Sequence, residues 1–77
     1  MKESLQTIIE ALVEDKSSIK IDEITNNRGV VFEVRVAASD MGRVIGKEGR
    51  IAKSIRTILK AVGTKEQKKV TIEFIDE

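Results

Sequence analysis

The sequence predicts an α+β fold with the order α-β-β-α-α-β, in which three helices pack on one face of a mixed three-stranded sheet. Two segments repeat apolar residues at helical spacing, and three others alternate apolar with polar residues. A glycine-containing loop separates two of the expected helices. With 77 residues, of which 40% are apolar, we expect one domain over 1–77 with a single core.

The first expected element is an amphipathic helix that begins near Glu3 or Ser4 and ends near Asp15. Its apolar residues follow the i, i+3, i+4, i+7, i+8 pattern, which forms one stripe on a helix. These residues are Leu5, Ile8, Ile9, Leu12 and Val13.

A β-hairpin should follow this helix. Residues 19–22 alternate as a half-buried strand does, and residues 30–36 form a second strand. Residues 26–29 read Asn-Asn-Arg-Gly, and Asn and Gly tolerate the positive φ that tight turns need. The short turn makes the pair antiparallel. The residues expected to face the core are Phe32, Val34 and Val36, with Glu33 and Arg35 facing water.

The second half should contain two helices and a strand. Ser39 and Asp40 are a plausible N-cap for a short helix that stops at Gly46. A longer helix should start near Arg50 and end at Gly63 as its C-cap. The apolar face of this helix comprises Ile51, Ile55, Ile58, Leu59 and Val62. Residues 70–75 alternate as a third strand, and its helical crossover from the second strand predicts parallel pairing.

The loop between these two helices carries the strongest chemical signal. It reads Val-Ile-Gly-Lys-Glu-Gly-Arg-Ile over residues 44–51. Glycines let a backbone approach a ligand closely, and a helix N-terminus suits a phosphate. A mononucleotide P-loop is rejected because Met41 and Glu48 stand where it needs Gly and Ser or Thr. Gly42 also lies too far from Gly46 for the dinucleotide fingerprint. The loop therefore reads as a phosphate clamp, or else as a helix corner that simply needs two glycines.

The basic charge gathers around this loop. The whole chain has a net charge of +1, but residues 41–60 hold six basic side chains against Glu48 alone, a net charge of +5. Residues 1–40 have a net charge of −3. Such a cluster is typical of nucleic-acid binding, with a solvated helix face as the alternative.

The Gly46-Lys47-Glu48-Gly49 loop and the order of elements around it resemble the type II, or prokaryotic, KH domain along the whole chain. The length and motif resemble its small single-domain bacterial RNA-binding members. The resemblance implies a narrow groove, between the loop, the adjacent helices and the sheet edge, that holds about four nucleotides of single-stranded RNA. The RNA-binding residues it implies are Arg43, Val44, Ile45, Gly46, Lys47, Glu48, Gly49, Arg50 and Lys53.

The resemblance also suggests the rest of the groove. The candidates for its apolar floor are Val44, Ile45, Ile51 and Ile55, with core packing as the alternative for each. A variable loop over residues 63–68 precedes the last strand, and its Lys65 and Lys68 are weak phosphate contacts. Glu48 partly offsets Lys47, and both aromatic residues, Phe32 and Phe74, are expected in the core. We therefore expect weak binding with little sequence selectivity and no base stacking on aromatic rings.

Weak binding by one site favours several domains acting together, because pairing raises the effective concentration. The resemblance points to self-pairing or to pairing with a second KH-containing protein. The expected surface lies on the longer helix, where Ile58, Ala61 and Val62 are the candidate interface residues. A fully buried helix face is the alternative.

The composition narrows the function classes. The chain has no Cys and no His, so we expect no catalytic site, no metal site and no cofactor. The sequence shows no signal peptide or membrane span, so we expect a cytoplasmic protein without membrane or small-molecule partners. The preferred function is binding of single-stranded RNA as a post-transcriptional regulator or RNA chaperone. The alternatives are a protein-interaction subunit that pairs with another KH protein and a ribosome-associated factor that binds rRNA.

Overall fold

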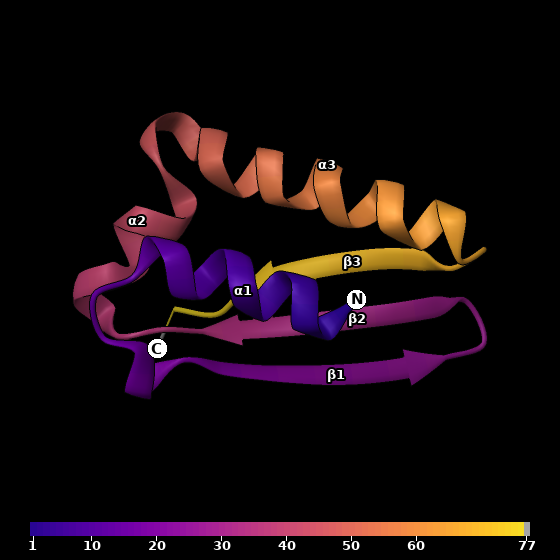
Figure 1. Cartoon of the computed structure of the whole chain (residues 1–77), viewed down its shortest axis with the longest axis horizontal. Helices are drawn as coiled ribbons and strands as arrows, with labels where there is room; N and C mark the ends of the chain where they lie inside the picture. Colours follow the sequence, from indigo (N-terminus) through magenta and orange to yellow (C-terminus); the bar gives the residue numbers. More distant parts are fainter. Residues whose placement is uncertain (77) are drawn as a thin grey trace.

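The structure is a computed structural model that describes residues 1–76. Its elements follow the predicted order (Figure 1). They are α1 (Lys2–Leu12), β1 (Lys20–Asn26), β2 (Gly29–Arg35), α2 (Met41–Ile45), α3 (Arg50–Lys65) and β3 (Lys69–Phe74). Short 3-10 turns lie at η1 (Lys16–Ser18), η2 (Ala38–Asp40) and η3 (Lys47–Gly49). The order confirms the predicted α+β class and is that of a type II KH fold.

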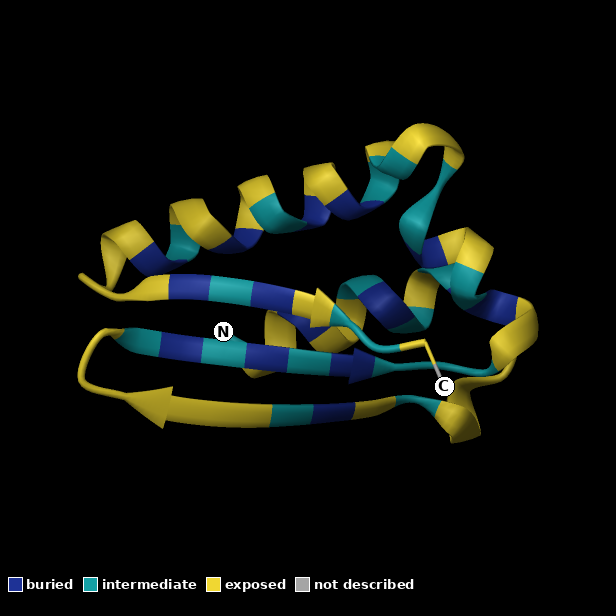
Figure 2. Cartoon of the chain, turned by 180° about the vertical axis from the view of Figure 1, so that it is seen from behind, coloured by how far each residue is buried: buried dark blue, intermediate teal, exposed yellow. Residues whose placement is uncertain are grey.

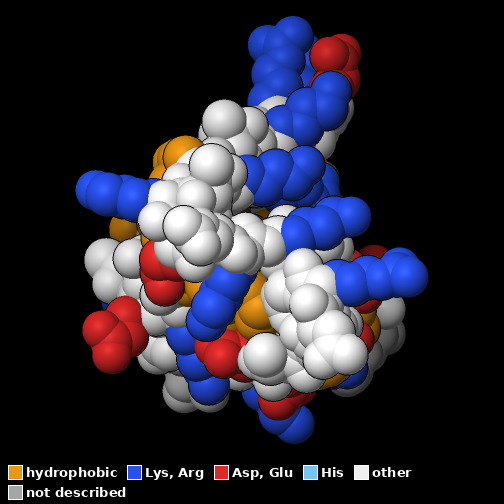
Figure 3. Space-filling model, turned by 90° about the vertical axis from the view of Figure 1, so that its right-hand side faces the viewer, with side chains coloured by type: hydrophobic (Ala, Val, Ile, Leu, Met, Phe, Trp, Pro, Cys, Tyr) orange, Lys and Arg blue, Asp and Glu red, His pale blue; other side chains and the backbone are white. Residues whose placement is uncertain are grey.

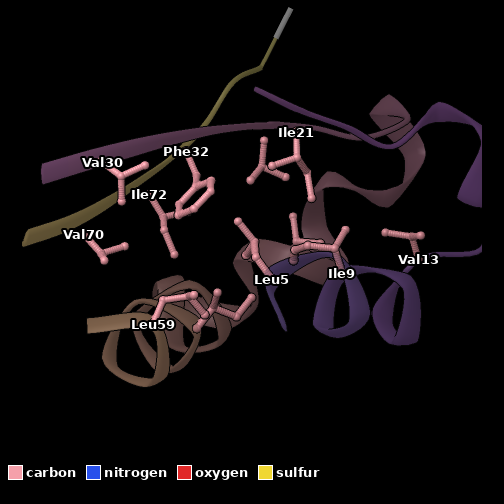
Figure 4. Packing of buried hydrophobic residues seen from close by; sticks show 12 residues of the cluster. Leu5, Ile9, Val13, Ile21, Val30, Phe32, Leu59, Val70 and Ile72 are labelled. Atoms are coloured by element: carbon pink, nitrogen blue, oxygen red, sulfur yellow. The ribbon is translucent and has the colours of Figure 1, made fainter. Parts of the chain in front are cut away.

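The sheet has the order β1-β2-β3, so β2 is central and β3 is an edge strand. β2 pairs antiparallel with β1 and parallel with β3, as predicted. Side chains alternate between the two faces of a sheet. One face carries Val30, Phe32 and Ile72, whose side chains point toward Leu5 of α1 and Leu59 of α3 (Figure 4).

Within residues 1–76, no helix packs on the opposite face of the sheet (Figure 1). The register places Asp22 opposite Glu33 and Glu33 opposite Glu73, so three carboxylates form one row across the strands. We call these three residues the acidic row. Arg35 pairs with Asp22 at 3.1 Å at one end of this row.

The core lies between the sheet and the helices. Its fully buried members are Leu5, Ile9, Phe32, Val34, Val44 and Leu59. The inward side of α3 is buried and its outward side is exposed (Figure 2). Of the core-facing residues predicted on β2, Phe32 and Val34 are confirmed as buried, and Val36 is partly buried against the same core.

Several element bounds differ from the predictions. α1 ends at Leu12 rather than Asp15, because Val13 is already extended, with φ −95° and ψ 156°. β1 continues to Asn26, although Ile21 is its only buried residue. Residues 23–26 are held by backbone pairing with β2, and this pairing extends along the whole of β1. Because the pairing is between main chains, these residues need no alternation of apolar and polar side chains.

Asp40 is confirmed as the N-cap residue of α2 by its position, whereas the predicted C-cap role of Gly63 was wrong. Asp40 precedes α2, but its side chain makes no capping hydrogen bond to that helix. α3 continues through Gly63 to Lys65, and the positive φ near its end belongs to Gln67. Gly63 is required because a Cβ there would lie 2.4 Å from Cγ2 of Val70.

Candidate functional site

The two glycines of the loop are needed for different reasons. Gly46 has a φ of +76°, and a Cβ at this position would lie 2.6 Å from Cγ1 of Ile51. Gly49 has a φ of +74°, but a Cβ there would meet open space. Glu48 between them also has a positive φ, of 56°, which is uncommon for a residue with a side chain. The backbone therefore turns sharply just before α3 begins.

This turn exposes the charged side chains of the loop. Lys47, Glu48 and Arg50 are all exposed. Arg50 lies 3.5 Å from Glu48, so the acid inside the loop is partly neutralised by its neighbour. Within residues 1–76, Lys47 has no carboxylate at ion-pair distance. Within this range, Lys47 is therefore an unpaired cation close to the N-terminus of α3. The unpaired N–H groups at a helix N-terminus favour an anion at the same place.

A groove of about 610 Å³ lies between α3 and β3, beyond the loop. Its walls come from both elements and from the turn between them. In the described part of the chain, β3 has no neighbouring strand on its outer side. The lining residues are Arg56, Lys60, Thr64, Gln67, Lys68, Lys69, Val70, Thr71 and Ile72. Seen from the end of the molecule where α3 finishes, Lys and Arg side chains follow one another from the top down the upper right-hand side (Figure 3). The groove is therefore apolar at its floor and basic at its rim.

Arg56 is fixed against the wall of this groove. Its Nε donates a hydrogen bond of 3.2 Å to the carbonyl oxygen of Ile72 on β3. Its guanidinium carbon lies 5.5 Å from the centre of the Phe74 ring, within range of a cation–π contact. Phe74 is partly exposed rather than fully buried. The flat guanidinium of Arg56 therefore lies at the groove, for which the sequence predicts no base stacking on aromatic rings.

The structure separates the predicted RNA-binding residues into two groups. Gly46, Lys47, Glu48, Gly49, Arg50 and Lys53 lie at the surface around the loop and the first turns of α3, with Ile45 half-buried beside them. Val44 is fully buried in the core, 0% exposed. Of the other floor candidates, Ile55 is buried and Ile51 is half-buried under Gly46.

Arg43 differs from the other predicted cations because two carboxylates hold it, one of them buried. It lies 3.1 Å from Asp40 and 2.9 Å from Glu14. Asp40 is 1% exposed, and its two carboxylate oxygens accept hydrogen bonds from the backbone N–H groups of Glu14 and Asp15, at 3.1 and 3.0 Å. These N–H donors, with Arg43 adding to them, lower the pKa of Asp40. The cluster joins the end of α1 to the start of α2.

The sequence analysis missed Arg56, Lys60 and Lys69 as residues of the groove. The first two were recognised only as part of a basic helix face. Their spacing of four residues places them on one side of α3, one turn apart, which was the available signal. The resemblance implied a groove between the adjacent helices and the sheet edge, but no pattern in the residues showed that Arg56 and Lys60 face it.

The candidate pairing residues lie on another part of α3. Ile58 is 49% exposed, whereas Ile55 and Leu59 on the same helix are buried. Ala61 is exposed and Val62 is half-buried.

Within residues 1–76, no group of three or more acidic, His or Cys side chains is placed to hold a metal ion. No helix in this part of the chain is both long and apolar enough to cross a membrane.

Comparisons with known proteins show which family the chain is similar to. The family described as "KhpA/KhpB, KH domain" matches residues 2–74. The RNA-binding protein KhpA of Clostridium acetobutylicum is 47% identical over 97% of this chain and its own full length. The proteins of the same name from Caldanaerobacter subterraneus and Aquifex aeolicus are 45% and 40% identical, over 97% and 99% of this chain and 100% and 96% of their own lengths. No solved structure matches the chain significantly.

Proposed function

Because the chain belongs to the KhpA/KhpB family of KH domains, we propose that it binds RNA, and that a short single strand lies between the glycine loop and the α3–β3 groove. Relatives that match it along their whole length are named RNA-binding proteins. The observation that carries the proposal is the groove, because its basic rim begins at Arg56, one helical turn along α3 from Lys53.

In this proposal the loop holds the RNA backbone. Lys47 and the N-terminus of α3 attract one phosphate, and Gly46 and Gly49 let it approach the main chain closely. Arg50 and Lys53 face the neighbouring phosphates. Arg43 has a positioning role instead, because its guanidinium is held by Asp40 and Glu14.

The bases lie in the groove and meet three kinds of group. The outer edge of β3 offers backbone hydrogen-bonding groups, and Val70 and Ile72 offer apolar contact. Arg56 offers a flat guanidinium, on which an unstacked base can stack as it would on an aromatic ring. None of these contacts is strongly selective for one base. The proposed role is therefore that of a post-transcriptional regulator or RNA chaperone that acts on many transcripts, in the cytoplasm where they are found.

A salt titration tests whether phosphates carry the binding. If about three to five phosphates are neutralised, log K for a short single strand should fall with log salt at a slope of about −2 to −3.5. Replacing Lys47 or Arg50 with Ala should each flatten the slope by less than about one unit. A slope near zero would show that the basic cluster is only a solvated face, and the clamp would be rejected.

We also propose that the working form is paired, with a second copy or with another KH protein. The observation that favours it is Ile58, whose exposed side chain lies beside Ala61 and Val62 on α3. Crosslinking in cells separates this role from the first, because it shows whether RNA or a protein is the dominant adduct.

A further inference from the structure

We propose that the RNA path does not end in the groove but continues around the hairpin end of the sheet, where Arg28, Lys68 and Lys69 contact the phosphates of further nucleotides. We call this surface the end site. The proposal rests on the proposed function and extends it beyond the about four nucleotides of a KH groove.

Two small hollows adjoin the groove at this end. One, of about 190 Å³, lies between the β1–β2 turn and the turn before β3. The other, of about 150 Å³, lies beside β2 and β3. The first shares Gln67 and Lys68 with the groove, and the second shares Lys69 and Thr71 with it. Asn26, Arg28 and Gly29 line both hollows, so the three depressions form one continuous surface.

The size of the hollows indicates what they can hold. Both are smaller than the about 300–1,000 Å³ of a typical small-molecule site. An extended chain that passes over them needs no enclosed cavity, because only its phosphates must be contacted. This favours a polymer that already occupies the adjoining groove.

The charge of the end site suits a polyanion. Arg28, Lys68 and Lys69 are exposed. Among residues 1–76, none of the three has a carboxylate at ion-pair distance. Lys69 at the start of β3 is paired in register with Gly29, and Arg28 in the β1–β2 turn directly precedes Gly29, so these two cations lie close together.

The backbone under these cations is already ordered. The side-chain oxygen of Asn26 accepts a hydrogen bond of 2.8 Å from the N–H of Arg28 and fixes the turn. A Cβ on Gly29 would lie 2.0 Å from the carbonyl oxygen of Lys69, so the two strands approach as closely as their main chains allow. Little ordering is needed before a phosphate can bind, which favours affinity.

The acidic row limits the path on the open face of the sheet. Glu33 and Glu73 lie on this face just beyond Val31 and Thr71, and they would repel further phosphates. The end site therefore has room for one or two phosphates.

Two RNA lengths test the inference. Isotope-labelled protein is titrated with random-sequence RNAs of four and of eight nucleotides, and amide shifts and affinities are measured. Both RNAs should shift the amides of residues 46–49 and 69–72. Only the longer one should also shift Arg28 and Gly29, and its salt slope should be steeper by about 0.7–1.4.

A matched pair of variants assigns the effect to the end site. Arg28→Glu should weaken binding of the eight-nucleotide RNA about fivefold while leaving that of the four-nucleotide RNA unchanged. Lys16→Glu changes the net charge similarly on the exposed η1 turn, away from the hairpin end, and should change neither.

The possible outcomes separate the two proposals. If neither RNA shifts residues 46–49, the proposed function itself fails. If the short RNA binds there but Arg28→Glu weakens both lengths equally or neither, the end site is rejected. If the end-site amides respond to an acidic peptide and not to the longer RNA, the surface binds protein and the inference is wrong.

Discussion

Lys47 is the residue on which the proposed clamp depends most directly. Replacing it with Asp leaves two carboxylates between the glycines, and these would repel the phosphates that Lys47 attracts. We expect RNA affinity to fall by at least about tenfold. Because Lys47 is exposed, the melting temperature should stay within about 3 °C of the wild-type value. Lys16→Asp is the matched control, and a folded Lys47→Asp variant that binds at full strength would contradict the clamp.

Asp40 makes the stability of the folded protein depend on pH. Its pKa is lowered in the folded protein by the N–H groups of Asp15 and Glu14 and by Arg43. Its ionised form therefore stabilises the fold above the ordinary carboxyl pKa of 3.8, and this contribution is lost as pH falls from there through the lowered value.

The variant Asp40→Asn should isolate this contribution. We expect its melting temperature to be several degrees below wild type at pH 7, and the gap should narrow when denaturation is measured from pH 5 down to pH 2. Asp15 also has a lowered pKa, through hydrogen bonds from Ser17 and Ser18. Because Asp15 is present in both proteins, its contribution cancels in the difference between their melting temperatures. A gap that stays constant over this range would show that the charge of Asp40 contributes nothing.

Replacing either of two helical glycines with Ala should change the free energy of unfolding, but in opposite directions. Gly42 in α2 is exposed, and a Cβ there meets nothing within 4 Å. Gly42→Ala should stabilise the protein by about 0.5–1 kcal/mol through helix propensity. Gly63→Ala gains the same propensity but forces a Cβ against Val70 and the carbonyl of Lys68, so a net loss of about 1–2 kcal/mol is expected. Urea denaturation measures both, and equal signs would show that packing against β3 does not decide the effect.

The elements that the sequence predicted well are those whose signal is local. The stripe of α1 and the alternation of β2 each repeat within one element, so the burial of Leu5, Ile9 and Phe32 followed from spacing alone. The glycine loop was placed correctly because its two glycines interrupt a helical pattern.

What the sequence could not predict depends on partners far along the chain. Asp40 accepts from N–H groups 25 and 26 residues away, and Gly63 is fixed by a strand that follows it. Arg56 joins the groove only because Ile72 and Phe74 lie beside it. None of these contacts leaves a periodic trace in the sequence. The exposed position of the loop residues could therefore be predicted from local signals, and the contacts along β3 could not.

The whole molecule should pair through α3. A symmetric dimer brings the same surface of both copies together, so one substitution alters the interface twice. Ala61→Glu should convert the paired form to monomer at tens of micromolar, as measured by sedimentation, and the monomer should stay folded because Ala61 is exposed in the single chain. Ala11→Glu, on the exposed side of α1, is the control. Wild-type protein that sediments as a monomer, both alone and in cell lysate, would remove the pairing proposal.

The acidic row has a consequence for how the molecule meets a polyanion. The net charge of +1 suggests a nearly neutral particle, yet carboxylates cross the helix-free face while free cations follow the loop and groove. Such a separation gives the molecule a dipole moment, and the field of an RNA exerts a torque on it before contact. RNA that approaches the helix-free face of the sheet is repelled by the acidic row, and RNA that approaches the groove is attracted by its cations. A protein of this charge should therefore associate with RNA faster than its net charge implies, and that advantage should vanish as salt shortens the reach of the field.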